Sequence, residues 1–342
     1  MITGTGGHDP WAVAWAVASW LAVRFGQPVV LTETPRRVGE GSDNEIHCAR
    51  FGGQALPPDW TSPLVLRVSP SADHLGQVNR EAAIQTFCVA LGYPAPRVLE
   101  VLGPGQVLDV PVLVMERAPG DTMLAAMLRH PRQIRAQLTR LAALQAQLHT
   151  LPTGAWPHRS DRGRRPPLLA ERRLGLVHAA LEDGVEDRAL GEALARTEEL
   201  LPFLAGSDEV VCHGDLHPLN VLVAAQEVHV VDWTDACLCD PHGDVARTVV
   251  AFDLAPLAIH SAAARSVVRI NSSWMRRRYL AAYVQSGPGR AIDARRLHLW
   301  ERVHLLHDWA KAAVADTPVT PQIIRSIRRR LARSLPADGP PR

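Results

Sequence analysis

A polar loop between two β-branched runs constrains this 342-residue chain more than any other feature. Residues 210–223 read Val-Val-Cys-His-Gly-Asp-Leu-His-Pro-Leu-Asn-Val-Leu-Val, and a second β-prone run follows at residues 228–233. Short β-branched runs bounded by glycine and proline predict strands, so the loop rests on a rigid strand-loop-strand support. Asp215 and Asn220 then lie in the loop and Asp232 ends the second strand, so three oxygen-bearing side chains can face one site.

These residue types suit phosphoryl transfer, in which metal ions and positioning stabilise the moving group. One carboxylate orients the acceptor hydroxyl and takes its proton, while a carboxylate and an amide oxygen hold Mg²⁺, which prefers oxygen ligands. The spacing His-x-Asp-x-x-x-x-Asn, with an Asp twelve residues further on, matches the kinase catalytic-loop pattern. We therefore predict that His213 and Asp215 are catalytic, with Asp215 as the base, and that Asn220 and Asp232 bind Mg²⁺.

The motif His-Gly-Asp-Leu-His-Pro-Leu-Asn at residues 213–220, followed by Asp-Trp-Thr-Asp-Ala from Asp232, resembles the aminoglycoside phosphotransferase family, which includes choline-kinase-like and related small-molecule kinases. Asp-Pro-His-Gly-Asp-Val-Ala-Arg at residues 240–247 is similar to the family's next motif, whose second Asp, here Asp244, braces the catalytic loop. The resemblance extends over most of the chain. It implies an α+β, two-lobe protein-kinase-like fold, with a small antiparallel-sheet N-terminal lobe and a larger, mostly helical C-terminal lobe, and ATP as phosphate donor.

Three segments of the N-terminal part resemble the family's nucleotide site. Residues 39–44 read Gly-Glu-Gly-Ser-Asp-Asn between strand-like runs, where glycines let backbone amides approach phosphate oxygens. Glu81 lies in a predicted helix, where kinases place the acid that pairs with a strand lysine, and residues 115–120 resemble the hinge whose main chain binds adenine. Taken alone, the three segments also fit an ordinary hairpin, a surface glutamate and a connecting loop. The nucleotide-binding residues predicted here are Gly39, Gly41, Ser42, Asn44, Glu81, Glu116 and Ala118.

Arg67 is the clear departure from the family. It stands in a predicted strand where the family normally carries lysine, and the chain's single lysine is Lys311. Arginine can pair with both Glu81 and phosphate oxygens, but its planar fork has a different geometry from a point-like ammonium. Two hypotheses stay open. The chain is an ATP- and Mg²⁺-dependent phosphotransferase acting on a hydroxyl of an antibiotic, a sugar or an amino alcohol, or it is a catalytically weak nucleotide-binding or regulatory module of the pseudokinase type.

Hydrophobic periodicity and turn residues predict the order of the elements. A buried helix is expected at 10–25, with Asp9 as its N-cap and Gly26 past its end. Beyond Gly120 the pattern is mostly helical, and residues 152–167 form a loop. Strands are expected at 29–31, 45–51, 64–68, 98–102 and 110–115 around a helix at 76–91, which gives a nucleotide-binding lobe over 1–117, a helical catalytic and substrate lobe over 118–335 and a flexible tail over 336–342.

Composition fits a cytoplasmic enzyme rather than a secreted or membrane protein. Hydrophobic residues make up 46% and charged residues 21%, which is ordinary for a folded soluble chain. The five scattered cysteines do not resemble a disulfide framework, and the apolar stretch at 11–23 is too short to span a bilayer. We expect no nucleic-acid or membrane partner, and the oligomeric state stays open. A zinc site drawn from Cys212, His213, Cys237, Cys239 and His242 has only loose Cys-x-Cys spacing in its favour.

The region from residue 265 to residue 333 is basic, with 15 arginines or lysines against four acids. It is interpreted as a solvated helical face or as an anion-binding surface. If it lines the acceptor pocket, it disfavours polycationic acceptors such as aminoglycosides. Trp274, Trp300 and Trp309 lie in the same region and can either pack in a helical core, which we favour, or stack on an acceptor.

Overall fold

The computed structural model describes residues 7–40, 44–164, 167–185, 187–206, 208–225, 227–258, 262–287, 291–315 and 320–333, with side chains except at 39–40, 255–258, 262–271 and 333. Two compact units make up the chain. The first contains Met1–Gly120 and Leu222–Thr234, and the second contains Asp121–Val221 and Asp235–Arg342. Within the described residues, no helix combines the length and apolarity needed to cross a membrane.

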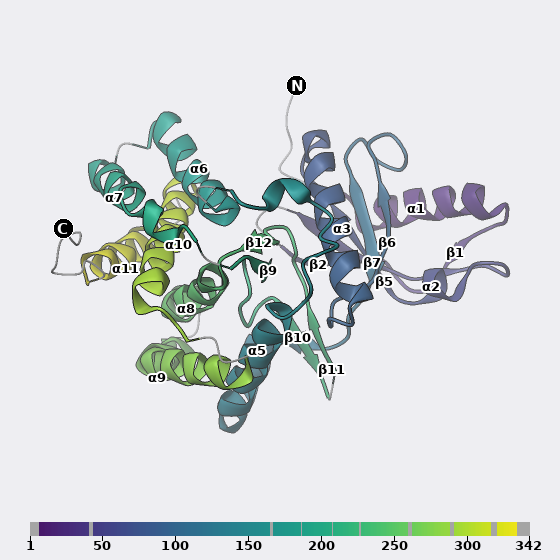
Figure 1. Cartoon of the computed structure of the whole chain (residues 1–342). Coiled ribbons are helices and arrows are strands. Elements are labelled where there is room, and N and C mark those ends of the chain that lie inside the picture. The colour runs from purple at the N-terminus through teal and green to yellow at the C-terminus, as the bar shows by residue number, and fades with distance from the viewer. Residues whose placement is uncertain are drawn as a thin grey trace. The chain divides into compact units, whose positions relative to one another are not determined.

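The first unit is built on a five-stranded antiparallel sheet in the order β2-β3-β5-β7-β6. Figure 1 shows α1 and α3 on opposite faces of this sheet. A separate two-stranded sheet pairs β1 with β4. The strands are β1 (Val30–Leu31), β2 (Arg36–Glu40), β3 (Glu45–Ala49), β4 (Phe51–Gly52), β5 (Leu64–Val68), β6 (Val98–Leu102) and β7 (Val112–Glu116), and the helices are α1 (Pro10–Phe25), α2 (Pro58–Thr61) and α3 (Leu75–Ala90).

Both predicted helices of this unit, at 10–25 and 76–91, and most of its predicted strands are confirmed. The carboxylate of Asp9 accepts the N–H of Ala12 at the start of α1, and Gly26 ends the helix in the left-handed conformation at φ 63°. β2 was not predicted, because its five residues place two arginines, a glycine and a glutamate around a single valine. Such a strand has no apolar alternation for a sequence pattern to detect.

Alternation along β5 decides which side chains meet which helix. Successive side chains of a strand point to opposite faces of the sheet. Leu64 and Leu66 belong to the core cluster with α1, whereas Val65 packs with the cluster formed by α3. Arg67 has the parity of Val65 and therefore points to α3, where Glu81 is only 2% exposed.

Residues 222–234 join the first unit through apolar and main-chain contacts. They include most of β10 (Val221–Ala224), all of β11 (Glu227–Val230) and Asp232. The ring of Trp233 packs edge-on against Tyr93, with centroids 5.5 Å apart, and the N–H of Val230 donates to the carbonyl of Pro94 at 2.8 Å. The sequence-based division groups this stretch with the helical lobe, since chain order does not reveal such long-range packing.

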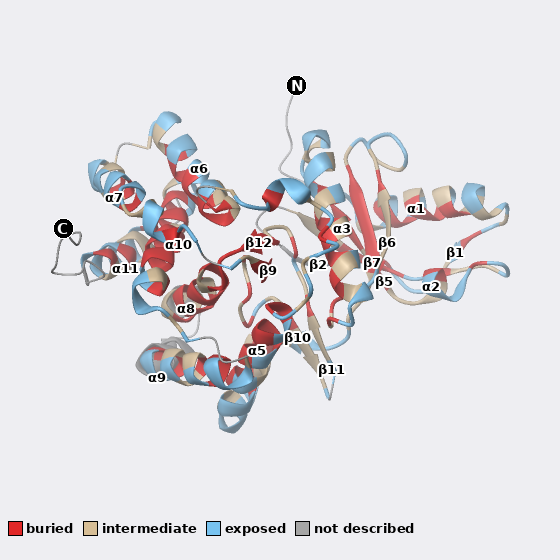
Figure 2. Cartoon of the chain, viewed as in Figure 1, coloured by how far each residue is buried: buried red, intermediate tan, exposed pale blue. Residues whose placement is uncertain are grey.

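The second unit is mostly helical, and α10 runs through its core. Figure 2 colours most of α10 as buried, and this helix packs against α6, α7, α8 and α11. Trp300 and Trp309 are 0% and 1% exposed, which confirms core packing, whereas Trp274 is 40% exposed. The elements are β8 (Asp121–Thr122), α4 (Met123–Arg129), α5 (Ile134–Leu148), α6 (Leu168–Glu182), α7 (Arg188–Glu198), β9 (Val210–Cys212), β12 (Cys237–Cys239), α8 (Pro241–Ala258), α9 (Ala262–Ser286), α10 (Ala294–Ala315) and α11 (Thr320–Arg333).

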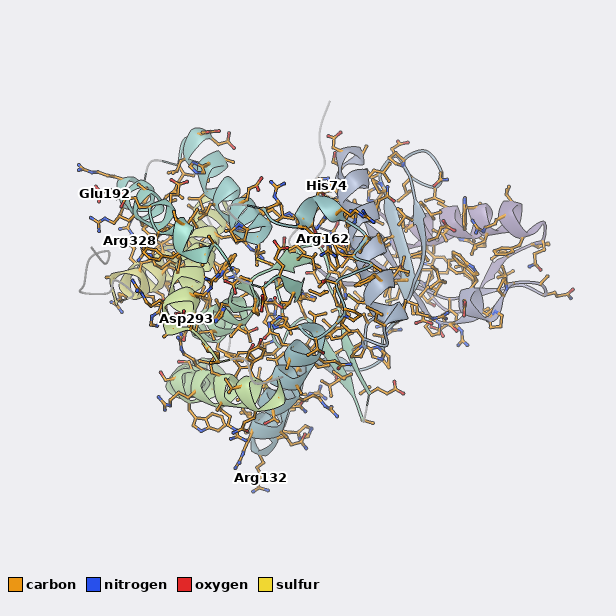
Figure 3. All side chains as sticks on the ribbon, viewed as in Figure 1. His74, Arg132, Arg162, Glu192, Asp293 and Arg328 are labelled. Atoms are coloured by element: carbon orange, nitrogen blue, oxygen red, sulfur yellow. The ribbon has the colours of Figure 1, made fainter. Side chains whose placement is uncertain are left out.

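Four arginines of the basic C-terminal region form ion pairs within the second unit. Arg296 pairs with the buried carboxylate of Asp240 at 2.8 Å. Arg328, labelled in Figure 3, pairs with Asp187 at 2.9 Å. Arg276 and Arg330 likewise bind acids, Glu301 and Asp253. The charges of these four arginines are paired within the second unit, whereas Arg277, Arg325 and Arg329 are exposed and have no ion pair with the described residues.

Candidate active site

The loop at residues 213–215 is fixed by a buried carboxylate. The N–H groups of His213 and Gly214 donate to the two oxygens of Asp244, at 3.0 and 2.7 Å. Asp244 lies in the first turn of α8 and also bonds the ring of His149 at 3.1 Å, which in turn contacts the Tyr283 hydroxyl at 2.7 Å. Burial alone would raise the pKa of Asp244, but the hydrogen bond and charge of His149 lower it. An ionised carboxylate therefore holds the loop backbone in place.

Gly214 supplies a conformation that this loop requires. Its φ is +81°, and a Cβ atom there would lie 2.6 Å from the carbonyl oxygen of Asp235. Arg173 of α6 ties the two segments together, because it donates to the Gly214 carbonyl at 2.9 Å and to the Asp235 carboxylate at 2.6 Å. The antiparallel pair of β9 and β12 delivers both segments to this position.

Asp215 is a partly exposed carboxylate set among cationic and polar groups. Arg247 donates to its Oδ1 at 2.5 Å and to Asp308 at 2.8 Å, while His217 Nε2 lies 3.5 Å from its Oδ2. Asn220 donates its amide N–H to the Asp215 carbonyl at 2.9 Å and approaches Oδ2 at 3.3 Å. Burial works to raise the pKa of Asp215, but Arg247 and His217 outweigh it and hold the pKa well below its ordinary range. Asp215 is thus ionised at neutral pH.

His213 itself has no exposed surface. Its Nδ1 accepts the N–H of Asp215 at 3.3 Å, so the ring supports the loop from inside. In this conformation it cannot touch a substrate, and its place in the site is that of a positioning residue.

Two oxygen atoms have the character of magnesium ligands, one in each unit. Because the Asn220 amide nitrogen donates to Asp215, its Oδ1 faces elsewhere and has no partner among the described residues. Asp232 is exposed, adopts a left-handed φ of +66°, and accepts the Thr234 hydroxyl through Oδ1 at 3.0 Å. Its Oδ2 has no partner in the described part of the chain. Hard oxygen donors of this kind fit Mg²⁺.

The pairing predicted between Arg67 and Glu81 is present in the first unit. Arg67 donates through Nη1 to Oε1 of Glu81 at 2.7 Å and through Nη2 to Oε2, a bidentate geometry available to arginine but not to lysine. Its buried Nε–H has no hydrogen-bond partner among the described residues. An orphaned donor on a cation fits an anionic ligand such as a phosphate.

The other predicted nucleotide residues that the structure describes lie in or close to the strands β2, β3 and β7. Gly39 is in β2 and Asn44 precedes β3, whereas Gly41 and Ser42 lie outside the described residues. The Glu116 side chain binds Arg97 at 2.7 Å. The main chain of Ala118 has no hydrogen-bond partner within the described ranges, so its N–H and carbonyl are available to a ligand.

The residues considered for zinc have other partners. Cys212 donates its thiol to the carbonyls of Cys239 and Asp240, at 3.6 and 3.7 Å, and burial raises its pKa to about 12. His242 pairs with Asp240 at 2.7 Å. His149, Cys212 and Asp244 have potential ligand atoms within 4.8 Å of one another, but the hydrogen bonds of the loop brace account for the histidine and the aspartate.

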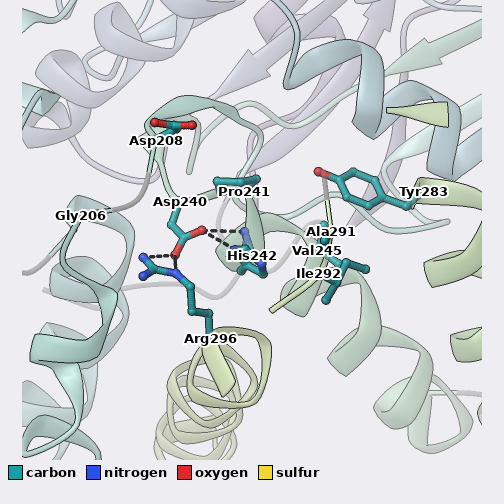
Figure 4. A pocket seen from close by; sticks show the side chains of 10 residues that line it. All are labelled: Gly206, Asp208, Asp240, Pro241, His242, Val245, Tyr283, Ala291, Ile292 and Arg296. Atoms are coloured by element: carbon teal, nitrogen blue, oxygen red, sulfur yellow. Dashed lines mark hydrogen bonds and ion pairs between the residues drawn. The ribbon is translucent and has the colours of Figure 1, made fainter. Parts of the chain in front are cut away.

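A pocket of about 290 Å³ lies in the second unit beside the start of α8. Figure 4 shows Asp240 and Arg296 paired within it and His242 bonded to the same aspartate. Asp240, His242 and Arg296 bind one another, whereas the exposed carboxylate of Asp208, which also lines the pocket, has no hydrogen bond or ion pair with the described residues. Tyr283 lines it and connects it through His149 to the loop brace.

Comparison with known proteins decides the family. The model of the family described as "Phosphotransferase enzyme family" matches residues 58–279, which is more than half of the chain. The chain belongs to this family. Over 219 residues the chain is 28% identical to the aminoglycoside 3'-phosphotransferase of Streptomyces fradiae. The matched region covers 61% of this chain and 76% of that protein.

Solved structures of other phosphotransferases confirm the predicted kinase-like fold. A thermostable mutant of aminoglycoside phosphotransferase APH(4)-Ia, in a ternary complex with ADP and hygromycin B, superimposes with a TM-score of 0.62 at 16% identity over 93% of this chain and 98% of that one. The ethanolamine kinase of Plasmodium vivax gives a TM-score of 0.59 at 14% identity, over 90% and 82% of the two chains. The family assignment and the fold make this phosphotransferase an enzyme of the small-molecule kinase type.

Several residues around the candidate site were given no role by the sequence. Arg247 and Thr234 stand inside the recognised motifs, but the motifs give them no role, and Asp308 is one of the four acids of the basic C-terminal region. Arg173 and His149 lie in helical stretches without any motif. Their roles depend on contacts between residues far apart in the chain, which no local pattern records.

Proposed function

We propose that this phosphotransferase transfers the γ-phosphate of ATP, with Mg²⁺, to a hydroxyl group of a small molecule. The observation that carries the proposal is the ionised carboxylate of Asp215, held on a backbone that Asp244 braces through two N–H bonds. Such a carboxylate can orient an acceptor hydroxyl and take its proton as the phosphoryl group arrives. Arg247 binds Oδ1 at 2.5 Å, whereas Oδ2 has only the longer contacts with Asn220 at 3.3 Å and His217 at 3.5 Å, so Oδ2 is the oxygen proposed to receive the acceptor hydroxyl.

Nucleotide binding is assigned to the first unit. Arg67, fixed by Glu81, would direct its orphaned Nε–H to a phosphate oxygen, and the free main chain of Ala118 would bind adenine. The 39–44 segment would cover the phosphates. The ADP bound in the APH(4)-Ia complex supports an adenine nucleotide as the donor.

Asn220 and Asp232 are proposed as the magnesium ligands, since each has an oxygen without a protein partner among the described residues. The metal would neutralise charge on the phosphates. The protein's part is to hold both oxygens in fixed positions, through Asp215 for Asn220 and through Thr234 for Asp232.

The proposed acceptor is a hydroxyl compound. The proteins similar to this chain include an aminoglycoside 3'-phosphotransferase and an ethanolamine kinase. Arg247 pairs with both Asp215 and Asp308, and Oδ1 of Asp308 has no partner in the described residues. A carboxylate in this position supports acceptors that carry an ammonium group.

The test is magnesium-dependent ADP release from ATP across a panel of aminoglycosides, macrolides, amino alcohols, sugars and nucleosides. Asp215→Asn should lower acceptor-stimulated release by about 10²–10⁴-fold, because it removes a positioned base. Asp232→Ala should abolish the magnesium-dependent turnover. Asp109→Asn, at an exposed carboxylate outside the site, is the matched control and should keep the wild-type rate.

A binding or regulatory module without turnover is the competing function. This alternative rests on Arg67, which stands where the family normally carries lysine. Arg67 nevertheless forms the expected ion pair, through a bidentate contact with Glu81. Tight ATP binding with no acceptor-stimulated release would favour the module. Stimulated release that Asp215→Asn removes would exclude it.

A further inference from the structure

Four polar side chains of the first unit form one connected cluster. Arg67 comes from β5 and Glu81 from α3, while Asp232 and Thr234 follow β11. The Thr234 hydroxyl lies 3.3 Å from Nη1 of Arg67, 3.0 Å from Oε2 of Glu81 and 3.0 Å from Oδ1 of Asp232. A single hydroxyl therefore connects the nucleotide-facing ion pair to the proposed magnesium ligand.

Counting hydrogens shows what this hydroxyl does. A threonine Oγ1 has one proton to donate and lone pairs to accept. Arg67 donates to it, and its own proton can serve Glu81 or Asp232 but not both at once. The carboxylates of Glu81 and Asp232 therefore compete for the single hydroxyl proton of Thr234, while the guanidinium of Arg67 binds both Glu81 and Thr234. Without the hydroxyl, the Asp232 carboxylate would lose its described hydrogen bond, and Arg67 Nη1 would lose one of its two acceptors.

The geometry of Asp232 makes this contact more important. Its φ of +66° is unfavourable for a residue with a side chain and persists only where neighbouring contacts impose it. The Thr234 hydroxyl is the described contact that holds the carboxylate in this arrangement. Trp233, packed against Tyr93, fixes the intervening residue.

Arginine matches this cluster better than lysine does. Both hydrogens of Nη1 are in use, one on Glu81 and one on Thr234, while Nη2 binds the second glutamate oxygen. The buried Nε–H still remains for an anion. A lysine has three donors on one atom, so it cannot hold both glutamate oxygens and the threonine and also keep a donor for phosphate.

We propose that Thr234 is a positioning residue that adapts this nucleotide site to arginine, so that positions 67 and 234 function as a pair. The inference rests on the proposed function, in which Arg67 faces a phosphate. It follows that restoring the family's lysine at position 67 weakens nucleotide binding in this chain. It also follows that Thr234 acts through its hydroxyl and not through its methyl group.

The experiment is a double-mutant cycle on AMP-PNP affinity, measured by calorimetry with and without magnesium. The variants are Arg67→Lys, Thr234→Val, Thr234→Ser and the double Arg67→Lys/Thr234→Val. Thr234→Val should weaken binding about tenfold, the effect of one hydrogen bond to a charged group, and Thr234→Ser should stay within about threefold of the wild type. Arg67→Lys should also weaken binding about tenfold, and the double variant should be no weaker than Arg67→Lys alone.

Thr32→Val is the matched control, because Thr32 lies in the same unit and its exposed hydroxyl bonds only the Arg50 carbonyl. It should bind AMP-PNP as the wild type does, and thermal unfolding should show that every variant is folded. Wild-type affinity in Thr234→Val, tighter binding in Arg67→Lys, or losses that multiply in the double variant would each overturn the pairing and leave the proposed function intact. A wild-type protein that does not bind AMP-PNP would instead overturn the proposed function, and the pairing with it.

Discussion

At the residue scale, the loop that carries Asp215 depends on the absence of a side chain at Gly214. The backbone there has a φ of +81° and lies against the carbonyl of Asp235. Two separate effects therefore oppose any substitution, a conformational cost at positive φ and a clash with main-chain atoms. Gly92 allows the conformational cost to be measured without the clash, because its φ is +79° and nothing lies within 4 Å of the position a Cβ would take.

Gly214→Ala should lower the free energy of unfolding by more than Gly92→Ala, whose cost is limited to the roughly 1–2 kcal/mol of a left-handed alanine. The added methyl would also move the carbonyl that Arg173 binds and displace Asp215, so catalytic turnover should fall sharply in Gly214→Ala alone. Urea denaturation and ADP release measure the two effects. Equal stability and equal activity in the two variants would show that the close approach to Asp235 has no consequence.

At the scale of elements, α10 places two neutral histidines against Gly243 and Arg173, next to the segments that support the loop at residues 213–215. His304 is fully buried and donates to the Gly243 carbonyl at 2.8 Å, and His307 Nε2 accepts an N–H of Arg173 at 2.7 Å. Burial lowers the pKa of both imidazoles, and the charges of Arg173 and Arg247 lower it further. The helix thus avoids two buried positive charges next to two arginines.

This arrangement predicts acid sensitivity. Below about pH 6.5, the ordinary pKa of histidine, the unfolded chain takes up protons that the folded chain does not, so stability falls as the pH decreases. Each histidine should contribute a slope of up to about 1.4 kcal/mol per pH unit. Urea denaturation between pH 7 and 5 should show this decline, with a smaller slope in His307→Gln. The same slope in His307→Gln as in the wild type would contradict the assignment, and the exposed His298→Gln on the same helix is the control.

At the scale of the whole molecule, the chain changes units twice near its recognised motifs. The first change falls between residues 221 and 222, just after Asn220, and the second between residues 234 and 235, just after Thr234. The proposed base therefore belongs to one unit, and the proposed phosphate-binding arginine belongs to the other. Nucleotide binding and proton removal should be separable by mutation.

ATP with magnesium should stabilise the folded chain by mass action, by about 2.7 kcal/mol at a ligand concentration of 100 times Kd. Asp215→Asn should retain this thermal stabilisation although it loses turnover, because Asp215 is not assigned to the nucleotide. Asp232→Ala should lose the part that depends on magnesium. Differential scanning calorimetry with ATP, with ATP and magnesium, and with neither distinguishes these outcomes, and loss of all ATP stabilisation in Asp215→Asn would contradict the division of roles.

The sequence by itself determined those features that arise from neighbours in the chain. Asp9, Pro10 and Gly26 act within a few residues of their own positions, so the bounds of α1 could be predicted from capping chemistry. The strands β5, β6 and β7 and the motif from His213 to Asn220 are similarly local patterns. The fold class followed from the motif's family, and the family match confirms it.

Only the tertiary structure decided which distant residues meet. The contacts of Arg67 with Thr234 and of Arg247 with Asp308 join positions 167 and 61 residues apart. Four arginines of the basic C-terminal region likewise pair with acids that are distant in the sequence. Hydrogen-bond partners, burial and pKa shifts depend on the environment that packing creates, and a local sequence window does not contain that environment. The sequence therefore predicts a chemical role for each candidate site residue, but it does not identify the residues that each one contacts.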